Sequence, residues 1–173
     1  PSTKKLEVNT TQAMIERVEA EHDIRPERLM GDSAYGTAEV LGYLVDDKGI
    51  APHIPVHDKT ARKDGTFSVQ DFAWDEEKAE YRCPAGKELK HQRRNYKKPR
   101  SGITKANTLI YRAKVKDCGP CPLKDRCCPK TRSRKITRSV NEAARDVARK
   151  ITGSEEYANH TSRQRKKVEM MFA

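Results

Sequence analysis

The most restrictive feature of the sequence is a strand, helix, strand pattern over residues 28–56. Two apolar residues, Leu29 and Met30, precede the turn sequence Gly-Asp-Ser-Ala-Tyr-Gly at 31–36, and a helical pattern begins at Thr37. That pattern ends at Gly49, and residues 50–56 predict an edge strand because they contain two prolines. Since a helical crossover between two strands makes the pair parallel, the predicted fold class is α/β.

Asp32 follows the first of these strands. In open α/β sheets, ligands bind beyond the carboxyl ends of the strands, so this position makes Asp32 a candidate for chemistry. The alternative is that Asp32 and Ser33 only form hydrogen bonds with the backbone of their own turn. A partner elsewhere in the chain is needed to decide between the two.

The rest of the chain predicts a core that is interrupted by an insertion. We expect helices that begin at Thr10 or Thr11, at Asn141 and near Ser162. Between residues 57 and 140 the pattern is β-like, with candidate strands at 67–74, 79–83 and 108–114. We therefore predict an α/β core built from residues 1–56 and 141–173 and a β-rich insertion at 57–140.

The positive charge lies in the second half of the chain. Residues 1–80 hold 10 basic and 17 acidic side chains, whereas residues 81–173 hold 26 and 8. Phosphate contacts supply most non-specific nucleic-acid affinity, so the basic runs at 87–100 and 130–138 predict a DNA-binding surface, although a solvated surface is the alternative. The predicted DNA-binding residues are Lys87, Lys90, Arg93, Arg94, Lys97, Lys98, Arg100, Arg132, Arg134 and Lys135.

All five cysteines lie in the predicted insertion. Their odd number and the expected cytoplasmic setting argue against disulfides, and four thiolates around Zn²⁺ can stabilise a small domain that has little apolar core. The spacing of two residues between Cys118 and Cys121 is typical of such sites. The predicted Zn²⁺ ligands are Cys83, Cys118, Cys121 and Cys127, with Cys128 as the alternative to Cys127.

The sequence has no signal that is typical of a membrane protein or of an exported protein. It contains no run of about 18 apolar residues and no signal-peptide pattern, so we expect a cytoplasmic protein that does not enter a membrane. No phosphate-binding glycine loop stands out. Because the chain begins without methionine and ends inside a helical pattern, we expect it to be part of a longer protein.

The end of the chain supplies the partner for Asp32. Arg165 and Glu169 are four residues apart in a basic helical pattern, which by itself is typical of an exposed ion pair. However, Gly-Asp-Ser-Ala-Tyr-Gly after a strand, a Cys-rich β insertion, and Arg, three residues, Glu-Met-Met-Phe together resemble the DDE transposases of bacterial insertion sequences. The resemblance covers nearly the whole chain.

This resemblance implies a ribonuclease-H-like catalytic domain, present here in part. Asp32 matches the second acid of the family's triad, Glu169 the final acid, and Arg165 the arginine four residues before it. Ser162 stands where the family often has tyrosine, and the family's lysine seven residues after the glutamate would follow Ala173. The first acid would precede Pro1, so we expect a fragment that is inactive alone.

The implied chemistry is DNA strand cleavage and strand transfer at insertion-sequence ends. Asp32 and Glu169 would hold Mg²⁺ or Mn²⁺, which suits hard oxygen ligands, and the insertion-sequence ends and the target DNA would be the partners. The alternative is a zinc-ribbon module that binds nucleic acid without catalysis. The sequence leaves open which DNA is recognised and whether the protein is a homo-oligomer.

Overall fold

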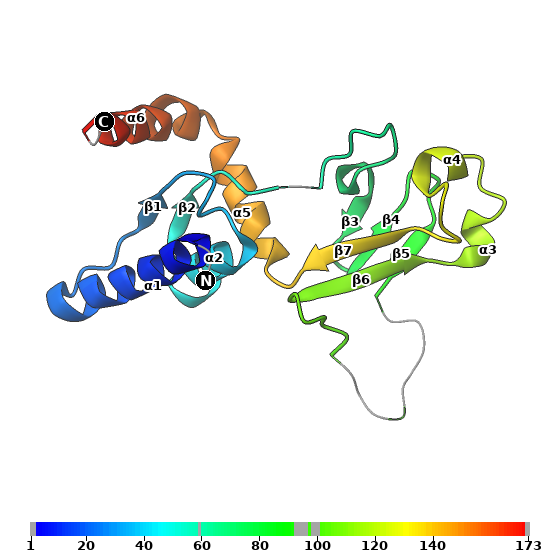
Figure 1. The fold of residues 1–173 in the computed structure, drawn as a ribbon, viewed down its shortest axis with the longest axis horizontal. Coiled ribbons are helices and arrows are strands. Elements are labelled where there is room, and N and C mark those ends of the chain that lie inside the picture. Colours follow the sequence, from blue (N-terminus) through cyan, green and yellow to red (C-terminus); the bar gives the residue numbers. More distant parts are fainter. Residues whose placement is uncertain (1–2, 59, 92–96, 98–100, 172–173) are drawn as a thin grey trace. The chain divides into compact units, whose positions relative to one another are not determined.

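The computed structural model describes residues 3–58, 60–91, 97 and 101–171, and their side chains except those of 3–9, 160–162, 165, 168, 169 and 171. The chain divides into two compact units (Figure 1). Unit 1 consists of Pro1–His57 and Asn141–Ala173, and unit 2 consists of Asp58–Val140. Each unit has a hydrophobic core of its own.

Unit 1 combines helices with one short parallel sheet. Its first part contains a long helix, a strand, a short helix that continues as a π-helical turn, and a second strand. The described residues of its second part form α-helices and a π-helical turn. The elements are α1 (Thr3–His22), β1 (Arg28–Met30), α2 (Ala38–Gly42), η1 (Tyr43–Asp47), β2 (Ala51–His53), α5 (Glu142–Thr152), η3 (Tyr157–Thr161) and α6 (Ser162–Met171).

The strands β1 and β2 form the predicted parallel pair, with Met30 opposite His53 at its carboxyl end. The crossover between them begins where the sequence indicates, because the Thr37 side chain accepts a hydrogen bond from the Val40 N–H. It ends before Gly49, whose φ of +67° is a backbone conformation that favours glycine. The α/β class of unit 1 is therefore confirmed.

The core of unit 1 lies between the crossover helix and α5. Leu41 and Leu44 are fully buried, and Ala144 and Ala148 of α5 are buried in the same cluster. Such small residues let two helices approach closely. The approach is close enough that a Cβ at Gly42 would lie 2.5 Å from the Asn141 side chain.

Asn141 differs from the prediction in one respect. It directly precedes α5, as expected, but its side chain does not cap that helix. Instead, the Asn141 Nδ2 atom donates to the Ala38 carbonyl oxygen at 3.1 Å. A long-range hydrogen bond to α2 has thus replaced the local cap.

Unit 2 is an antiparallel meander in which neighbouring strands pair in chain order. A 3-10 turn precedes the sheet, and two short helices lie between its last two strands. The elements are η2 (Val69–Asp71), β3 (Ala73–Asp75), β4 (Glu80–Arg82), β5 (Glu88–Lys90), β6 (Thr108–Ala113), α3 (Val115–Cys118), α4 (Lys124–Cys127) and β7 (Lys135–Ser139).

Aromatic side chains fill much of the core of unit 2. The rings of Tyr81 and Tyr111 meet edge to face with centroids 5.3 Å apart, and Trp74 contacts both rings. The guanidinium of Arg138 lies 4.0 Å from the centroid of the Trp74 ring. Edge-to-face rings and a stacked cation add attraction to the burial of apolar area. This explains how a unit with few aliphatic residues keeps a core.

Several boundaries differ from the sequence predictions. The first helix begins at Thr3 rather than at Thr10 or Thr11, and Met14 on it is 46% exposed. The expected strand at 67–74 is divided into η2 and the start of β3. Strands β5 and β7 were not predicted, because their lysine and arginine residues obscure the alternation of apolar and polar positions.

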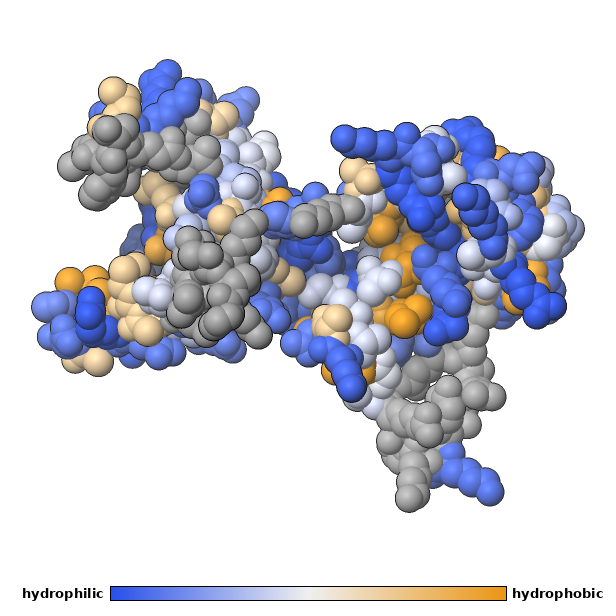
Figure 2. Space-filling view, in the orientation of Figure 1, coloured by the Kyte–Doolittle hydropathy of each residue, from blue (hydrophilic) through white to orange (hydrophobic). Residues whose placement is uncertain are grey.

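The visible surface of both units is largely hydrophilic, as Figure 2 shows. The larger exposed apolar residues are distributed over several elements; Ile24 and Val115, for example, come from different units. No helix among the described residues is long and apolar enough to span a membrane.

Candidate functional site

The turn that carries Asp32 begins directly after β1, at the carboxyl end of the parallel pair. The Asp32 side chain is exposed, and its Oδ1 atom accepts a hydrogen bond from the Ala34 N–H at 2.7 Å. A carboxylate has about four lone-pair sites, so this one bond leaves acceptor capacity for a cation. The turn role of Asp32 and a role in chemistry are therefore compatible.

Gly36 holds this turn against the chain that follows β2. The Gly36 carbonyl oxygen accepts a hydrogen bond from the His57 N–H at 2.9 Å, and a Cβ at position 36 would lie 2.0 Å from the Pro55 carbonyl oxygen. No side chain can be accommodated at that distance, so only glycine permits the approach. The backbone around Asp32 is therefore fixed relative to the end of β2.

The segment that leads into α6 starts beside the same strand. The rings of His53, the last residue of β2, and Tyr157, the first residue of η3, have centroids 6.3 Å apart. Arg28 of β1 pairs with Glu156, with 3.5 Å between Nη1 and Oε1. These contacts tie the beginning of η3 to the parallel pair, and α6 follows η3 directly.

Arg165 and Glu169 both lie in α6, four residues apart, a spacing that puts them on one face of the helix. Their side chains lie outside the described residues, so the structure defines no distance from Glu169 to Asp32. The neighbouring Lys166 and Lys167 are exposed. The described part of this helix thus presents positive charge to solvent.

All five cysteines line one small cavity of unit 2, with a volume of about 20 Å³. We call it the thiol cavity. Cys83 follows β4, Cys118 ends α3, Cys121 lies in the next turn, Cys127 ends α4 and Cys128 follows it. All five thiols are free. Folding therefore gathers residues that are far apart in the sequence.

The turn after β4 orients Cys83. The Cys83 carbonyl oxygen accepts a hydrogen bond from the Gly86 N–H at 2.8 Å, and the Cys83 Sγ atom accepts one from the Lys87 N–H at 3.3 Å. Gly86 adopts a φ of +74°, which explains why the turn uses glycine. The turn thus holds the Cys83 sulfur next to a backbone N–H donor.

Burial favours the neutral thiol at two of the other cysteines, Cys118 and Cys127. Burial raises the pKa of the Cys118 thiol, and burial followed by the neighbouring Cys128 raises the pKa of Cys127 to about 12. Among the described residues, no group of three or more His, Cys, Asp or Glu side chains is arranged to hold a metal ion. The predicted Zn²⁺ ligands thus share a cavity without forming a coordination site in this arrangement.

The predicted DNA-binding residues fall into several groups. Lys87, Lys97, Arg132 and Lys135 are exposed. The charge of Lys90 is balanced by carboxylates, since its Nζ atom lies 3.0 Å from Glu88 and 3.5 Å from Glu80. The predicted residues that lie outside the described part of the chain are Arg93, Arg94, Lys98 and Arg100.

Arg134 corrects the expectation of an exposed contact. Its side chain is buried, with a residue exposure of 7%. Its Nη1 atom donates to the Cys127 carbonyl oxygen at 2.9 Å, its Nη2 atom donates to the Phe67 carbonyl oxygen at 2.7 Å, and its guanidinium stacks on Phe72. A basic run in the sequence cannot reveal that one of its side chains turns inward.

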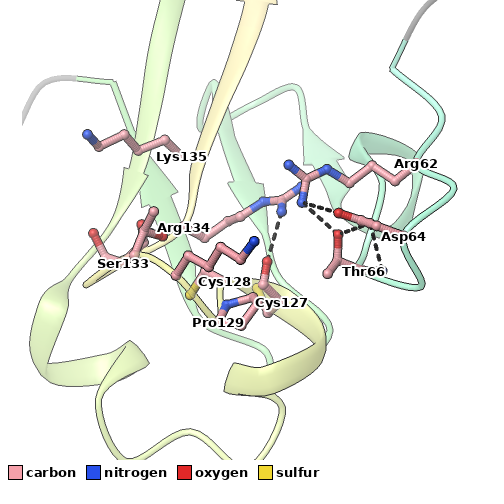
Figure 3. Close-up of a pocket in the computed structure, with 11 residues that line it drawn as sticks. Arg62, Asp64, Thr66, Cys127, Cys128, Pro129, Ser133, Arg134 and Lys135 are labelled. Atoms are coloured by element: carbon pink, nitrogen blue, oxygen red, sulfur yellow. Dashed lines mark hydrogen bonds and ion pairs between the residues drawn. The ribbon is translucent and has the colours of Figure 1, made fainter.

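Arg134 also lines a larger pocket of unit 2, of about 260 Å³ (Figure 3). We call it the basic pocket, because Arg62, Lys130, Arg134 and Lys135 line it and Asp64 is its single acid. Sequence reasoning missed Arg62, which reaches the pocket from a loop before the sheet. The sequence signal near Arg62 was the turn Asp64-Gly65-Thr66. This turn holds the Arg62 side chain, because Arg62 Nη1 donates a hydrogen bond to Thr66 Oγ1 at 2.6 Å.

Comparison with known proteins gives a match to a protein family. A family model described as a transposase DDE domain matches residues 82–173, which is more than half of the chain. The matched region contains all five cysteines and extends through α6, whereas Asp32 precedes it. Searches of curated proteins and of solved structures found no match.

Proposed function

The chain belongs to the transposase DDE domain family, and on this premise we propose that it serves in metal-dependent DNA strand cleavage and strand transfer at insertion-sequence ends. Membership gives it a function related to transposition, with DNA as the substrate. Because the substrate is DNA, we also propose a cytoplasmic location.

The position of Asp32 carries the proposal. An exposed carboxylate follows β1 at the carboxyl end of a parallel pair, where α/β proteins bind ligands. The ring of His53, at that same end of the pair, lies near the ring of Tyr157. From Tyr157 the chain continues through η3 into α6. This supports a ribonuclease-H-like core in which α6 brings Glu169 towards Asp32.

Asp32 and Glu169 would together hold Mg²⁺ or Mn²⁺. The Asp32 carboxylate fits such an ion because it is an oxygen ligand, is exposed and keeps acceptor capacity beyond its bond to Ala34. With the ions bound, the site would activate water, and later a DNA 3′-hydroxyl, for in-line attack on a phosphodiester. Arg165, on the same helical face as Glu169, would attract the phosphate being cut.

A cleavage assay tests this proposal. The chain, and the chain extended upstream of Pro1 through the strand that carries the first acid, are incubated with labelled insertion-sequence ends and Mg²⁺ or Mn²⁺. We expect the extended chain to cut, and Asp32→Asn or Glu169→Gln to reduce the rate by about 100- to 1,000-fold, the range for losing one group that stabilises the transition state electrostatically. Asp47→Asn, which alters another exposed acid of unit 1, should leave the rate unchanged.

The alternative function remains the zinc-ribbon module that binds nucleic acid. It is favoured by one observation, namely that unit 2 has its own core and gathers every cysteine around one cavity. If the extended chain bound DNA but never cut it with all acids intact, this alternative would replace the catalytic proposal.

We further propose that the thiol cavity binds a structural Zn²⁺ through Cys83, Cys118, Cys121 and Cys127. Free thiols around one cavity are the right donors, and the Lys87 N–H bond to Cys83 suits a thiolate. The four sulfur atoms would have to move closer together than they are in this structure, because Zn–S bonds are about 2.3 Å long. Cys128 lines the same cavity and is the alternative to Cys127.

Metal content tests the zinc proposal. The purified protein should carry about one zinc per chain, and Cys118→Ser should lose the metal and destabilise unit 2, because the energy of metal binding contributes to folding. Comparing Cys127→Ser with Cys128→Ser identifies the fourth ligand, since only the true ligand variant should lose zinc. A folded, zinc-free protein would contradict the proposal.

A further inference from the structure

The basic pocket holds more positive charge than its own acid can balance. In Figure 3 the guanidinium groups of Arg62 and Arg134 lie next to each other. The acid, Asp64, is engaged with Thr66, whose N–H and Oγ1 donate to Asp64 Oδ1 at 3.1 and 2.5 Å. Its distance to Arg62 is 4.0 Å, which is the outer limit of an ion pair. Two adjacent cations are thus left largely uncompensated.

Arg134 brings a buried charged group to the lining of this pocket. Two of its nitrogen atoms donate to the Cys127 and Phe67 carbonyl oxygens, and these bonds fix the plane of the guanidinium. Its Nε atom is buried and has no hydrogen-bond partner among the residues that the structure describes. A buried charged group with an unused donor is costly unless an acceptor is supplied. An anion in the pocket would supply one.

Further positive charge comes from exposed residues that line the same pocket. Lys130 and Lys135 are both exposed, so they can reach an anion from the solvent side. A volume of about 260 Å³ admits a phosphate group together with water. The described lining contains no aromatic ring on which a base could stack. The chemistry therefore fits a backbone phosphate better than a free nucleotide.

We propose that the basic pocket docks one phosphodiester of the DNA backbone, between Arg62 and Arg134. Arginine pairs favourably with phosphate oxygens, and such a contact positions DNA without reading its sequence. This proposal rests on the proposed function, because it assumes that DNA is the substrate. It adds the part of unit 2 that would contact the DNA backbone.

The test measures DNA binding as a function of salt. A labelled duplex of random sequence is titrated with the wild-type chain and with Arg62→Ala, Lys130→Ala and the double variant. Each phosphate contact contributes about 0.9 to the slope of log affinity against log salt. If both residues hold the same phosphate, each single variant should lose at most about 0.9 from the slope, and the double variant should lose about 0.9 rather than 1.8.

Lys105→Ala is the matched control, because it removes an exposed charge from unit 2 outside the pocket lining. Its slope should equal that of the wild type. Arg134 is not mutated in this test, since its bonds to two carbonyl groups would confound binding with folding. The thermal midpoint of each variant shows whether the fold is kept.

The outcomes separate this proposal from the one on which it rests. If the wild type binds DNA and the double variant keeps its slope, the docking proposal is overturned while the DNA substrate stands. If the wild type shows no salt-dependent DNA binding, the proposed function itself fails. If inorganic phosphate raises the thermal midpoint only when Arg62 is present, yet the DNA slopes do not change, the pocket takes a free anion and the docking proposal is likewise overturned.

Discussion

The Arg134 guanidinium donates to the Cys127 carbonyl oxygen at 2.9 Å, and both residues line the thiol cavity as well as the basic pocket. Cys128 also lines both. The two cavities therefore share a wall. A rearrangement of the thiols would shift the main chain to which Arg134 is bonded, so metal binding and DNA binding should be coupled.

Cys83→Ser should test this coupling, because Cys83 lines the thiol cavity and is not part of the basic-pocket lining. With zinc present, we expect the variant to bind duplex DNA several-fold more weakly than the wild type, since the shared wall would lose its metal support. Fluorescence anisotropy measures the affinity. In a chelator the two proteins should bind equally; a difference that persists there would mean that the effect passes through the fold instead.

Gly36→Ala should destabilise unit 1 strongly. The new Cβ would lie 2.0 Å from the Pro55 carbonyl oxygen, so the backbone must move, at a cost of about 1–3 kcal/mol or more. Urea unfolding measures the loss. Gly31→Ala is the matched control in the same turn region, because its nearest neighbour is a side-chain atom of Ile54 at 3.4 Å. A smaller loss at Gly36 than at Gly31 would contradict the assigned close approach.

Glu142→Ala should cost about 3 kcal/mol of unfolding free energy, the lower end of the range for breaking a buried ion pair. The Glu142 carboxylate is buried and accepts hydrogen bonds from Arg145 and Arg149 at 2.9 Å each, so its removal weakens the compensation of two cations. Chemical denaturation measures the change. Asp146→Ala, which removes a half-exposed partner of Arg149, should cost less than about 1 kcal/mol.

Lowering the pH should reduce the stability of unit 2, because Glu88 becomes protonated. Hydrogen bonds from Lys114 and then from Lys90 lower the pKa of Glu88 from 4.5 to about 2. Lys90 also faces Glu80 at 3.5 Å. Because the folded-state pKa is below the unfolded value, Glu88 stabilises the fold above pH 4.5, and this contribution disappears as the pH falls towards 2.

Glu88→Gln should therefore lower the thermal midpoint slightly at pH 7 and make no difference near pH 2. The effect is small because the group is exposed and solvent screens its charge. Thermal unfolding followed by circular dichroism across this pH range measures it. Glu76→Gln, at an exposed turn position of the same unit, serves as the control.

Local signals in the sequence predicted the strand, helix, strand part of unit 1 well. The Thr37 cap, the apolar spacing of the crossover and the stop at Gly49 are short-range features, and the structure has each of them. The side chain of Asn141 shows the limit of such signals. A good capping residue was available to α5, but the hydrogen bond to Ala38 on a distant helix replaced the cap.

The candidate sites were harder to predict, because they depend on contacts between segments that are far apart in the sequence. Asp32 could be predicted because one strand and one turn determine its position. For Arg62 the sequence offered only the neighbouring turn at 64–66, since its pocket exists only after the loop before η2 meets the segment between α4 and β7. Arg134 was predicted as a basic residue, but its burial results from hydrogen bonds to Cys127 and Phe67, which no local pattern encodes.

The bond between Arg145 and the His57 carbonyl oxygen, at 3.2 Å, joins the two points where the chain leaves unit 1 and returns to it. To the core of unit 1, the whole of Asp58–Val140 is one loop whose ends are already held together. Since the entropy of closing a flexible loop grows only slowly with its length, this loop could be lengthened, shortened or exchanged at little cost to the core. Unit 2 is thus an exchangeable insertion from the point of view of unit 1, and relatives could carry quite different domains at the same junction.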